Sequence, residues 1–168
     1  MMFLFILALG TLVAAAIGRR SSWPTHLRRG LAAAMLVAGM THLARPDPFL
    51  AHLPEWVPAR ELIVALTGII EIILGAALFG PSRHRRAVGR VLVAYLVVVF
   101  PANIYVAVAD VDVEGQPGGP YAWLRLPVQA LLVCIALWST RLTAVGPADP
   151  RVPDHRVDPP AVAACGER

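Results

Sequence analysis

Five long apolar segments constrain the fold of this chain more than any other feature. They run from about Met2 to Gly18, from Pro24 or Gly30 to Ala44, from Leu62 to Phe79, from Ala87 to Ala109, and from Tyr121 to Trp138. Each approaches the roughly 17–25 residues that a helix needs to cross the hydrocarbon core of a bilayer. An open sheet would leave backbone groups unpaired in lipid. We therefore predict an all-α fold, a membrane helix bundle.

Composition supports the lipid bilayer as the partner of this chain. Hydrophobic residues make up 57% of the 168 residues and charged residues only 15%, against about 25% charged in a typical soluble domain. The basic residues are all Arg and form short clusters between the apolar runs, so topology explains them better than nucleic-acid binding. Cys134 and Cys165 form no C-x-x-C pair, which argues against a disulfide framework or a zinc site.

Two of the five segments leave an alternative open. The fully apolar part of the second segment is short, but a helix that begins at Pro24 reaches spanning length, because proline is favoured in a first helical turn. Arg28 and Arg29 would then extend to the membrane interface. The first segment could be a signal peptide, yet no basic residue precedes it, so we expect it to be retained as a helix.

The loop charges predict the orientation of the chain in the cell membrane. Arg residues cluster in the first and third loops, whereas the second loop is nearly balanced and the fourth carries acidic residues and no Arg. Cytoplasmic loops are the Arg-rich ones. We expect a multi-pass protein with its N-terminus outside and its C-terminus in the cytoplasm.

The same pattern divides the chain into three parts. Residues 1–20 form an N-terminal transmembrane helix, residues 21–142 a four-helix membrane domain, and residues 143–168 a Pro-rich tail that we expect to be disordered. The second loop is apolar, and Phe49 and Trp56 suit an interfacial turn or short helix. The fourth loop is rich in Gly and Pro and is predicted to be a turn.

Glu71 is the strongest candidate functional residue, because it lies in the middle of the third segment. An ionisable group near the centre of a bilayer is a functional hypothesis by default. Gly68, Glu71 and Gly75 follow at spacings of three and four and share one helix face, and small residues let another helix approach. We expect Glu71 to face the bundle interior. A structural hydrogen bond from a protonated Glu71 explains the same pattern about equally well.

Four further polar residues lie inside the segments, each with a structural alternative. Asn103 follows Pro101, which removes a backbone donor and is expected to kink its helix; Asn103 could simply satisfy the freed backbone. Arg125 and Gln129 share a face of the last segment, although Arg125 could extend to the headgroups instead. His42 could be an ordinary hydrogen-bonded residue at the interface. A metal shared by His42 and His52 is a weak alternative, so we predict no metal site.

The predicted topology places these five residues in the outer half of the membrane. At about 1.5 Å per residue, His42 and Arg125 lie near the outer boundary, Asn103 and Gln129 lie deeper, and Glu71 lies deepest. This predicts a polar, ligand-binding cavity open to the outside, with Glu71 at its floor. Glu71 would be ionised if Arg125 approached it and neutral if Arg125 pointed to the headgroups.

Several of these stretches resemble the DoxX-like family of small bacterial membrane proteins, and the likeness covers about Leu31 to Trp138. The stretches are Gly39 to His42 with the Pro- and Phe-containing loop after it, the Gly-x-x-Glu-x-x-x-Gly run from Gly68 to Gly75, Phe100-Pro101-Ala102-Asn103, and Leu124 to Gln129. The resemblance implies a four-helix core, here with one extra N-terminal helix. Some relatives are a membrane subunit of a thiosulfate:quinone oxidoreductase and a methylamine-utilisation maturation protein, but this chain has no cysteine pair.

Three functions therefore compete. The first is an accessory membrane protein that binds a small ligand and is not itself an enzyme, with no covalently bound cofactor. The second is a quinone-interacting subunit of an oxidoreductase, in which Glu71 and His42 relay protons to a quinone. The third is a small transporter, which the lack of a visible inverted repeat weakens.

Overall fold

The computed structural model describes residues 2–18, 21–113 and 119–141, and every regular element in these ranges is a helix, as predicted. The six α-helices and one short 3₁₀ helix are α1 (Met2–Ile17), α2 (Trp23–Ala44), α3 (Asp47–Leu50), α4 (Arg60–Leu78), η1 (Ser82–His84), α5 (Arg85–Val108) and α6 (Pro120–Arg141). The five long helices lie within a few residues of the five predicted segments.

Proline residues have different effects along the chain. Pro24 lies in the first turn of α2, where no hydrogen bond from its nitrogen is needed, so the second helix takes the longer of its two predicted forms. Pro101 and Pro127 lie inside α5 and α6, and both helices continue past them. A spanning helix can therefore retain an internal proline when neighbouring groups compensate for the lost backbone bond.

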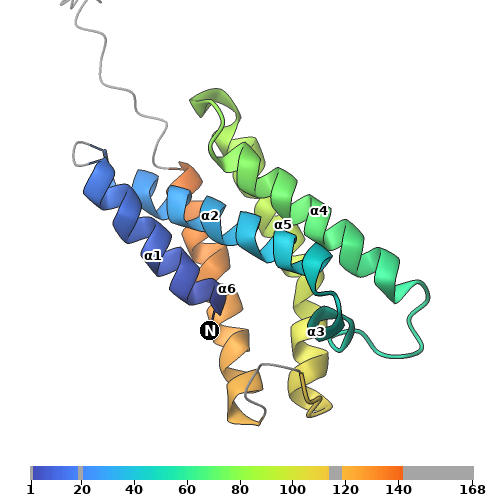
Figure 1. The fold of residues 1–168 in the computed structure, drawn as a ribbon. Helices are drawn as coiled ribbons and strands as arrows, with labels where there is room; N and C mark the ends of the chain where they lie inside the picture. Colours follow the sequence, from blue (N-terminus) through green and yellow to red (C-terminus); the bar gives the residue numbers. More distant parts are fainter. Residues whose placement is uncertain (1, 19–20, 114–118, 142–168) are drawn as a thin grey trace, which may run out of the picture.

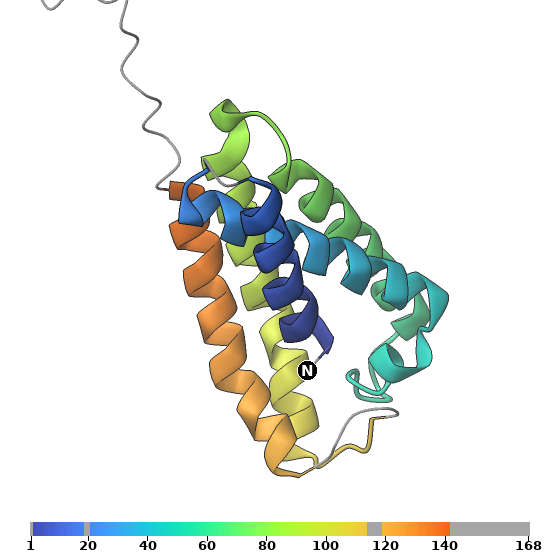
Figure 2. The same ribbon diagram turned by 60° about the vertical axis from the view of Figure 1, so that its left-hand side comes forward.

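The long helices form two layers. In Figure 1, α1, α2 and α4 lie side by side in one layer with α5 and α6 behind them, and Figure 2 shows α5 and α6 next to each other as a pair. The helix α2 contacts α1, α4 and α6, so it joins the layers. Its core residues Leu31 and Met35 are almost completely buried.

Three of the described helices, α4, α5 and α6, are long and apolar enough to cross a membrane, and the apolar part of α1 is shorter. Less than a third of each of these three spans is buried inside the protein. Their exposed side chains are nevertheless large and apolar, among them Ile73, Val98 and Leu131. An apolar surface of this extent is expected where lipid is the solvent. The chain is thus an all-helical protein whose spans suit a membrane bundle.

Glycine allows α2 and α4 to approach each other closely. A β-carbon on Gly39 would strike the carbonyl oxygen of Gly68, and one on Gly75 would lie 3.0 Å from the carbonyl oxygen of Ala32. Gly68 and Gly75 therefore have the packing role that their spacing predicted. A comparable contact joins α5 and α6, where a β-carbon on Gly89 would strike the Thr140 side chain.

One of the predictions for the loops and tail is confirmed, and two concern residues that the structure does not describe. The second loop contains the four-residue helix α3, so the predicted short helix is present. Most of the Gly/Pro-rich turn, residues 114–118, and the tail from residue 143 fall outside the described ranges.

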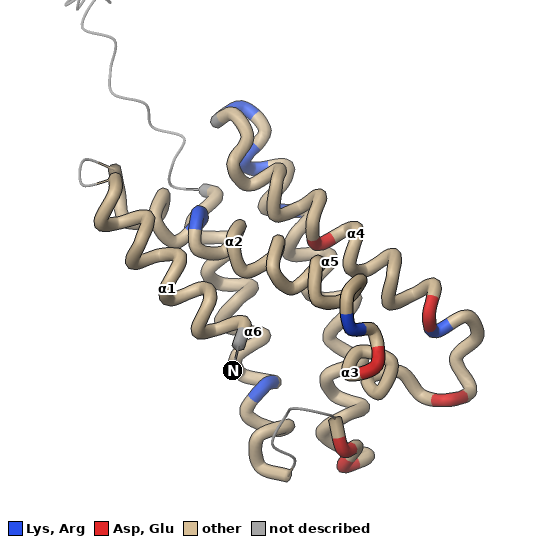
Figure 3. The backbone as a smooth tube through the Cα atoms, in the orientation of Figure 1, with Lys and Arg blue, Asp and Glu red and all other residues tan. Residues whose placement is uncertain are grey.

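Charge separates the two ends of the bundle, as the tube in Figure 3 shows. What we call the arginine end is where α2 and α5 begin and α4 and α6 end. It carries Arg28, Arg29, Arg83, Arg85, Arg86 and Arg90 and no acidic residue among those described. What we call the α3 end carries Asp47, Glu55, Glu61, Asp110 and Asp112, together with Arg45, Arg60 and Arg125.

Candidate functional site

Glu71 faces the interior of the bundle, as its glycine neighbours predicted. Its side chain is only 12% exposed. The Tyr95 hydroxyl, from α5, donates a hydrogen bond of 2.8 Å to Glu71 Oε1. Glu71 therefore links the two layers of helices at mid-height, because it lies near the middle of α4 and Tyr95 near the middle of α5.

His42 approaches Glu71 from the end of α2. Its Nε2 lies 3.8 Å from Glu71 Oε2, and its Nδ1 lies 3.2 Å from the Thr67 hydroxyl oxygen. Thr67 donates its single hydrogen to the Val64 carbonyl, 2.9 Å away. Thr67 can then only accept from His42, so Nδ1 carries a proton. In a neutral His42 this leaves Nε2 as the bare nitrogen that faces Glu71.

We call His42, Thr67, Glu71 and Tyr95 the polar cluster. Glu71 Oε2 is buried and has no hydrogen-bond partner among the described residues. The 3.8 Å to His42 Nε2 exceeds a direct hydrogen bond, which is roughly 2.7–3.2 Å. A polar atom of a ligand that lay beside both Glu71 Oε2 and His42 Nε2 could form a hydrogen bond with each of them. A proton can also reside on either the carboxyl or the imidazole, so the pair can donate or accept.

Arg125 does not join the polar cluster, and it pairs with His52 instead. Arg125 Nη1 lies 3.0 Å from His52 Nε2, while His52 Nδ1 lies 2.8 Å from the Pro48 carbonyl. Burial, and after it the charge of Arg125, lower the pKa of His52 to about 4, against the opposing effect of the hydrogen bond to the Pro48 carbonyl. His52 is therefore neutral near pH 7, donating from Nδ1 and accepting at Nε2.

The ring of Phe49 connects the two groups. Its centroid lies 3.7 Å from that of His42 and 6.4 Å from that of His52. Phe49 therefore lies close to both His42, which belongs to the polar cluster, and His52, which pairs with Arg125. Among the described residues, no cluster of three or more His, Cys, Asp or Glu could hold a metal ion.

The remaining predicted residues form no hydrogen bond or ion pair with Glu71 in the described part of the chain. Gln129 is buried and donates a 2.9 Å hydrogen bond to the Leu96 carbonyl, so it ties α6 to α5 next to Tyr95. Asn103 is half-buried, and its side chain has no hydrogen bond among the described residues. The structure thus brings His42 and Glu71 together, and it places Arg125 and Gln129 in contacts of their own.

A comparison with protein families identifies the family of this chain. A family described as a domain of unknown function, DUF8561, matches residues 31–140, well over half of the chain. The chain belongs to the DUF8561 family. The matched region begins inside α2 and ends inside α6, so it contains the whole polar cluster and leaves out α1. No curated protein and no solved structure matches the chain.

Sequence reasoning missed several residues of this DUF8561 site. Tyr95 was overlooked because it lies in a long apolar run, where a hydroxyl has no partner of its own and needs one from another helix. Thr67 stands four residues before Glu71, a spacing that places both on one face. His52 was considered only as a metal ligand. A search for every hydroxyl and imidazole near mid-segment would have found the first two.

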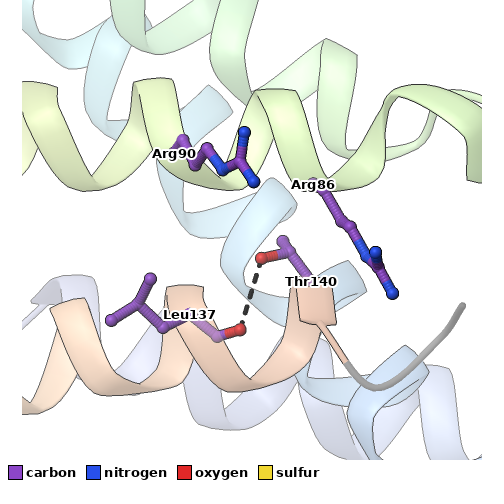
Figure 4. Close-up of a pocket in the computed structure, with 4 residues that line it drawn as sticks. All are labelled: Arg86, Arg90, Leu137 and Thr140. Atoms are coloured by element: carbon purple, nitrogen blue, oxygen red, sulfur yellow. Dashed lines mark hydrogen bonds between the residues drawn. The ribbon is translucent and has the colours of Figure 1, made fainter.

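A pocket of about 300 Å³ lies at the arginine end of this DUF8561 protein, and no residue of the polar cluster lines it. It is lined by Arg86, Arg90, Leu137 and Thr140, and Figure 4 shows it between α5 and α6. Nothing in the sequence analysis singled out this position, because its arginines were assigned to topology alone.

Proposed function

We propose that this DUF8561 protein is an accessory membrane protein that binds a small ligand at the polar cluster. The observation that carries this proposal is the buried Oε2 of Glu71, which lacks a partner and lies 3.8 Å from His42 Nε2. A buried carboxyl oxygen without a partner costs about 1–3 kcal/mol. A ligand with a hydroxyl, amine or carbonyl group that contacts both side chains would offset this cost.

The arrangement suits binding better than catalysis by the isolated chain. The cluster offers one exchangeable proton shared by Glu71 and His42, and a tyrosine hydroxyl that already donates to Glu71. It holds no activated nucleophile, because Thr67 is engaged with Val64. The ligand would be small and amphipathic, with a polar head in the cluster and an apolar body against the surrounding side chains.

A quinone is the second candidate, and the shared proton favours it. Reduction of a quinone requires proton delivery, and Glu and His serve as proton carriers within membranes. Here the two groups stand together between apolar helices. In this role the protein would be the quinone-interacting subunit of an oxidoreductase, and electrons would come from a partner subunit.

Ligand extraction tests both candidates. The wild-type protein, Glu71→Gln and Glu61→Gln would be purified in mild detergent, and bound small molecules would be identified by mass spectrometry. Glu61→Gln is the matched control, because Glu61 is an exposed carboxylate on the same helix. We expect a bound molecule in the wild type and the control, and its loss in Glu71→Gln. A quinone among the lost molecules would favour the second candidate, and retention in Glu71→Gln would disprove the site.

We further propose four DoxX-like helices, α2, α4, α5 and α6, with α1 as an added N-terminal crossing. The match that begins at residue 31 supports this division, as does the resemblance of residues 31–138 to DoxX-like proteins. The helix α2 has 22 residues, which gives a length of about 33 Å. Arg29 at its beginning would lie at the interface, whereas Arg28 is buried and donates a 3.0 Å hydrogen bond to the Leu78 carbonyl.

The arginine end is proposed to face the cytoplasm, with the N-terminus outside and the C-terminus inside. The six arginines there have no described acidic neighbour at that end, which is the asymmetry of the positive-inside rule. Single cysteines at Ser82 and Asp112, in a chain without Cys134 and Cys165, test the orientation. A membrane-impermeant maleimide should label Asp112→Cys in intact cells and Ser82→Cys only after lysis. The reverse pattern would invert the topology.

A further inference from the structure

The pocket at the arginine end is built from two neighbouring helices. Arg86 and Arg90 lie one turn apart on α5 and therefore share a face, and Leu137 and Thr140 lie three residues apart on α6. In Figure 4 the Arg86 side chain extends toward the end of α6. The close contact of Gly89 with Thr140 fixes the distance between the helices beside the pocket.

The two pocket arginines carry charge that the described protein does not neutralise. Neither has an ion-pair partner among the described residues, and Glu71 lies in the polar cluster. The other described acidic residues lie at the α3 end. Nearby, Arg28 lies within electrostatic reach of Arg85, and the Nε atoms of both are buried without a partner. This end therefore has a positive potential that would attract an anion.

The chemistry of the lining indicates a phosphate group. Arginine presents a planar fork of donors that matches phosphate oxygens. The Thr140 hydroxyl already donates to the Ala136 carbonyl at 2.7 Å, so the guanidinium groups are the available donors. Basic pockets between transmembrane helices on the cytoplasmic side bind anionic lipid headgroups. Leu137 and the exposed Trp138 ring would place apolar surface next to an acyl chain.

We propose that this pocket binds the phosphate group of an anionic ligand at the membrane surface, carried by a phospholipid headgroup or by a free phosphate ester. The proposal is independent of the function assigned to Glu71, because it uses different residues at the opposite end of α6 from Arg125. Topology alone would account for arginines at this end. It does not account for two of them lining one pocket between helices.

The test compares two double variants of the full chain. Arg86→Gln/Arg90→Gln removes the pocket charges, and Arg29→Gln/Arg83→Gln removes the same charge from the same end but outside the pocket. Both are purified in neutral detergent, checked for helical content, and titrated with phosphatidylglycerol and with phosphatidylcholine by native mass spectrometry. At about one kcal/mol for each arginine, we expect roughly 30-fold weaker phosphatidylglycerol binding in the pocket variant and little change in the control.

Two competition experiments, with inorganic phosphate and with oleate, identify the source of the phosphate group. Inorganic phosphate that displaces phosphatidylglycerol at low concentration would indicate a free phosphate ester, and displacement only by anionic lipid would indicate a headgroup. Oleate, an anionic amphiphile without phosphate, should compete poorly. The proposal fails if both double variants weaken binding equally, if oleate binds as well as phosphatidylglycerol, or if the wild type does not prefer phosphatidylglycerol to phosphatidylcholine.

Discussion

The contacts of α2 with α4 and of α5 with α6 use the same device with different results. In each, a glycine lets the second helix approach so closely that a β-carbon would not fit. Beside the α2–α4 contact, polar side chains bond to one another and leave one carboxyl oxygen open. Beside the α5–α6 contact, two arginines line a pocket and find no protein anion. Close packing therefore sets the distance between helices, while the neighbouring side chains decide whether polar groups are satisfied internally.

The largest expected effect is a loss of stability when a methyl group is added at Gly39 or at Gly89, the glycines of the two helix contacts. In Gly39→Ala the new carbon meets a backbone oxygen that cannot move without its helix, whereas in Gly89→Ala it meets the Thr140 side chain. Overpacking costs about 1–3 kcal/mol, and we expect about 3 for Gly39→Ala and about 1 for Gly89→Ala. Thermal unfolding in detergent measures both.

Ala94→Val is the control for this pair, because Ala94 is exposed on α5 and the substitution adds more volume than either glycine variant. It should leave the unfolding temperature nearly unchanged. Equal losses in Gly39→Ala and Gly89→Ala would show that α2 and α4 can separate as readily as a side chain can rotate.

The second effect is a pH dependence of the unfolding free energy, which arises from His52 at the α3 end. The pKa of His52 is about 4 in the folded protein and 6.5 when unperturbed. Between these values the unfolded chain binds the proton and the folded chain does not, so stability falls as the pH decreases from 6.5 toward 4. We expect His52 to account for about 2 kcal/mol of that loss. Unfolding measured across this pH range should show it.

Two variants isolate the contribution of His52. In His52→Gln this part of the pH dependence should disappear, because no imidazole remains to be protonated beside Arg125. In His84→Gln, which changes an exposed histidine at the arginine end, the wild-type dependence should remain. A wild-type profile in His52→Gln would assign the effect to other groups.

The sequence predicted the helices well and the site only in part, for a physical reason. Long apolar segments and the spacing of Gly68, Glu71 and Gly75 are local patterns, and each follows from helix geometry alone. The partners of Glu71 and Arg125 depend on how helices distant in the chain pack. Depth in the membrane suggested that Arg125 could approach Glu71, but Arg125 pairs with His52, in the turn that follows α3, instead. No local pattern encodes that contact.

The smallest expected loss of stability is that of Tyr95→Phe. This variant tests the difference between a carboxyl oxygen that has a hydrogen-bond donor and one that has none. Removing the hydroxyl leaves Glu71 Oε1 without its 2.8 Å donor, so both carboxyl oxygens would lack a partner. We expect a loss of about 1 kcal/mol in unfolding free energy, measured by unfolding in detergent. Tyr105→Phe is the control, because Tyr105 lies on the same helix and has no hydrogen bond from its hydroxyl among the described residues.

A double variant then separates stability from ligand binding at the polar cluster. In Tyr95→Phe/Glu71→Leu the lost hydrogen bond is counted once, because each single variant already removes it, so the combined cost should be smaller than the sum of the two single costs. If the costs simply add, Tyr95 and Glu71 act independently, and the carboxyl is not held in place by the hydroxyl. An additive result would also weaken the proposed ligand site, because Oε2 faces His42 only while Oε1 is held by Tyr95.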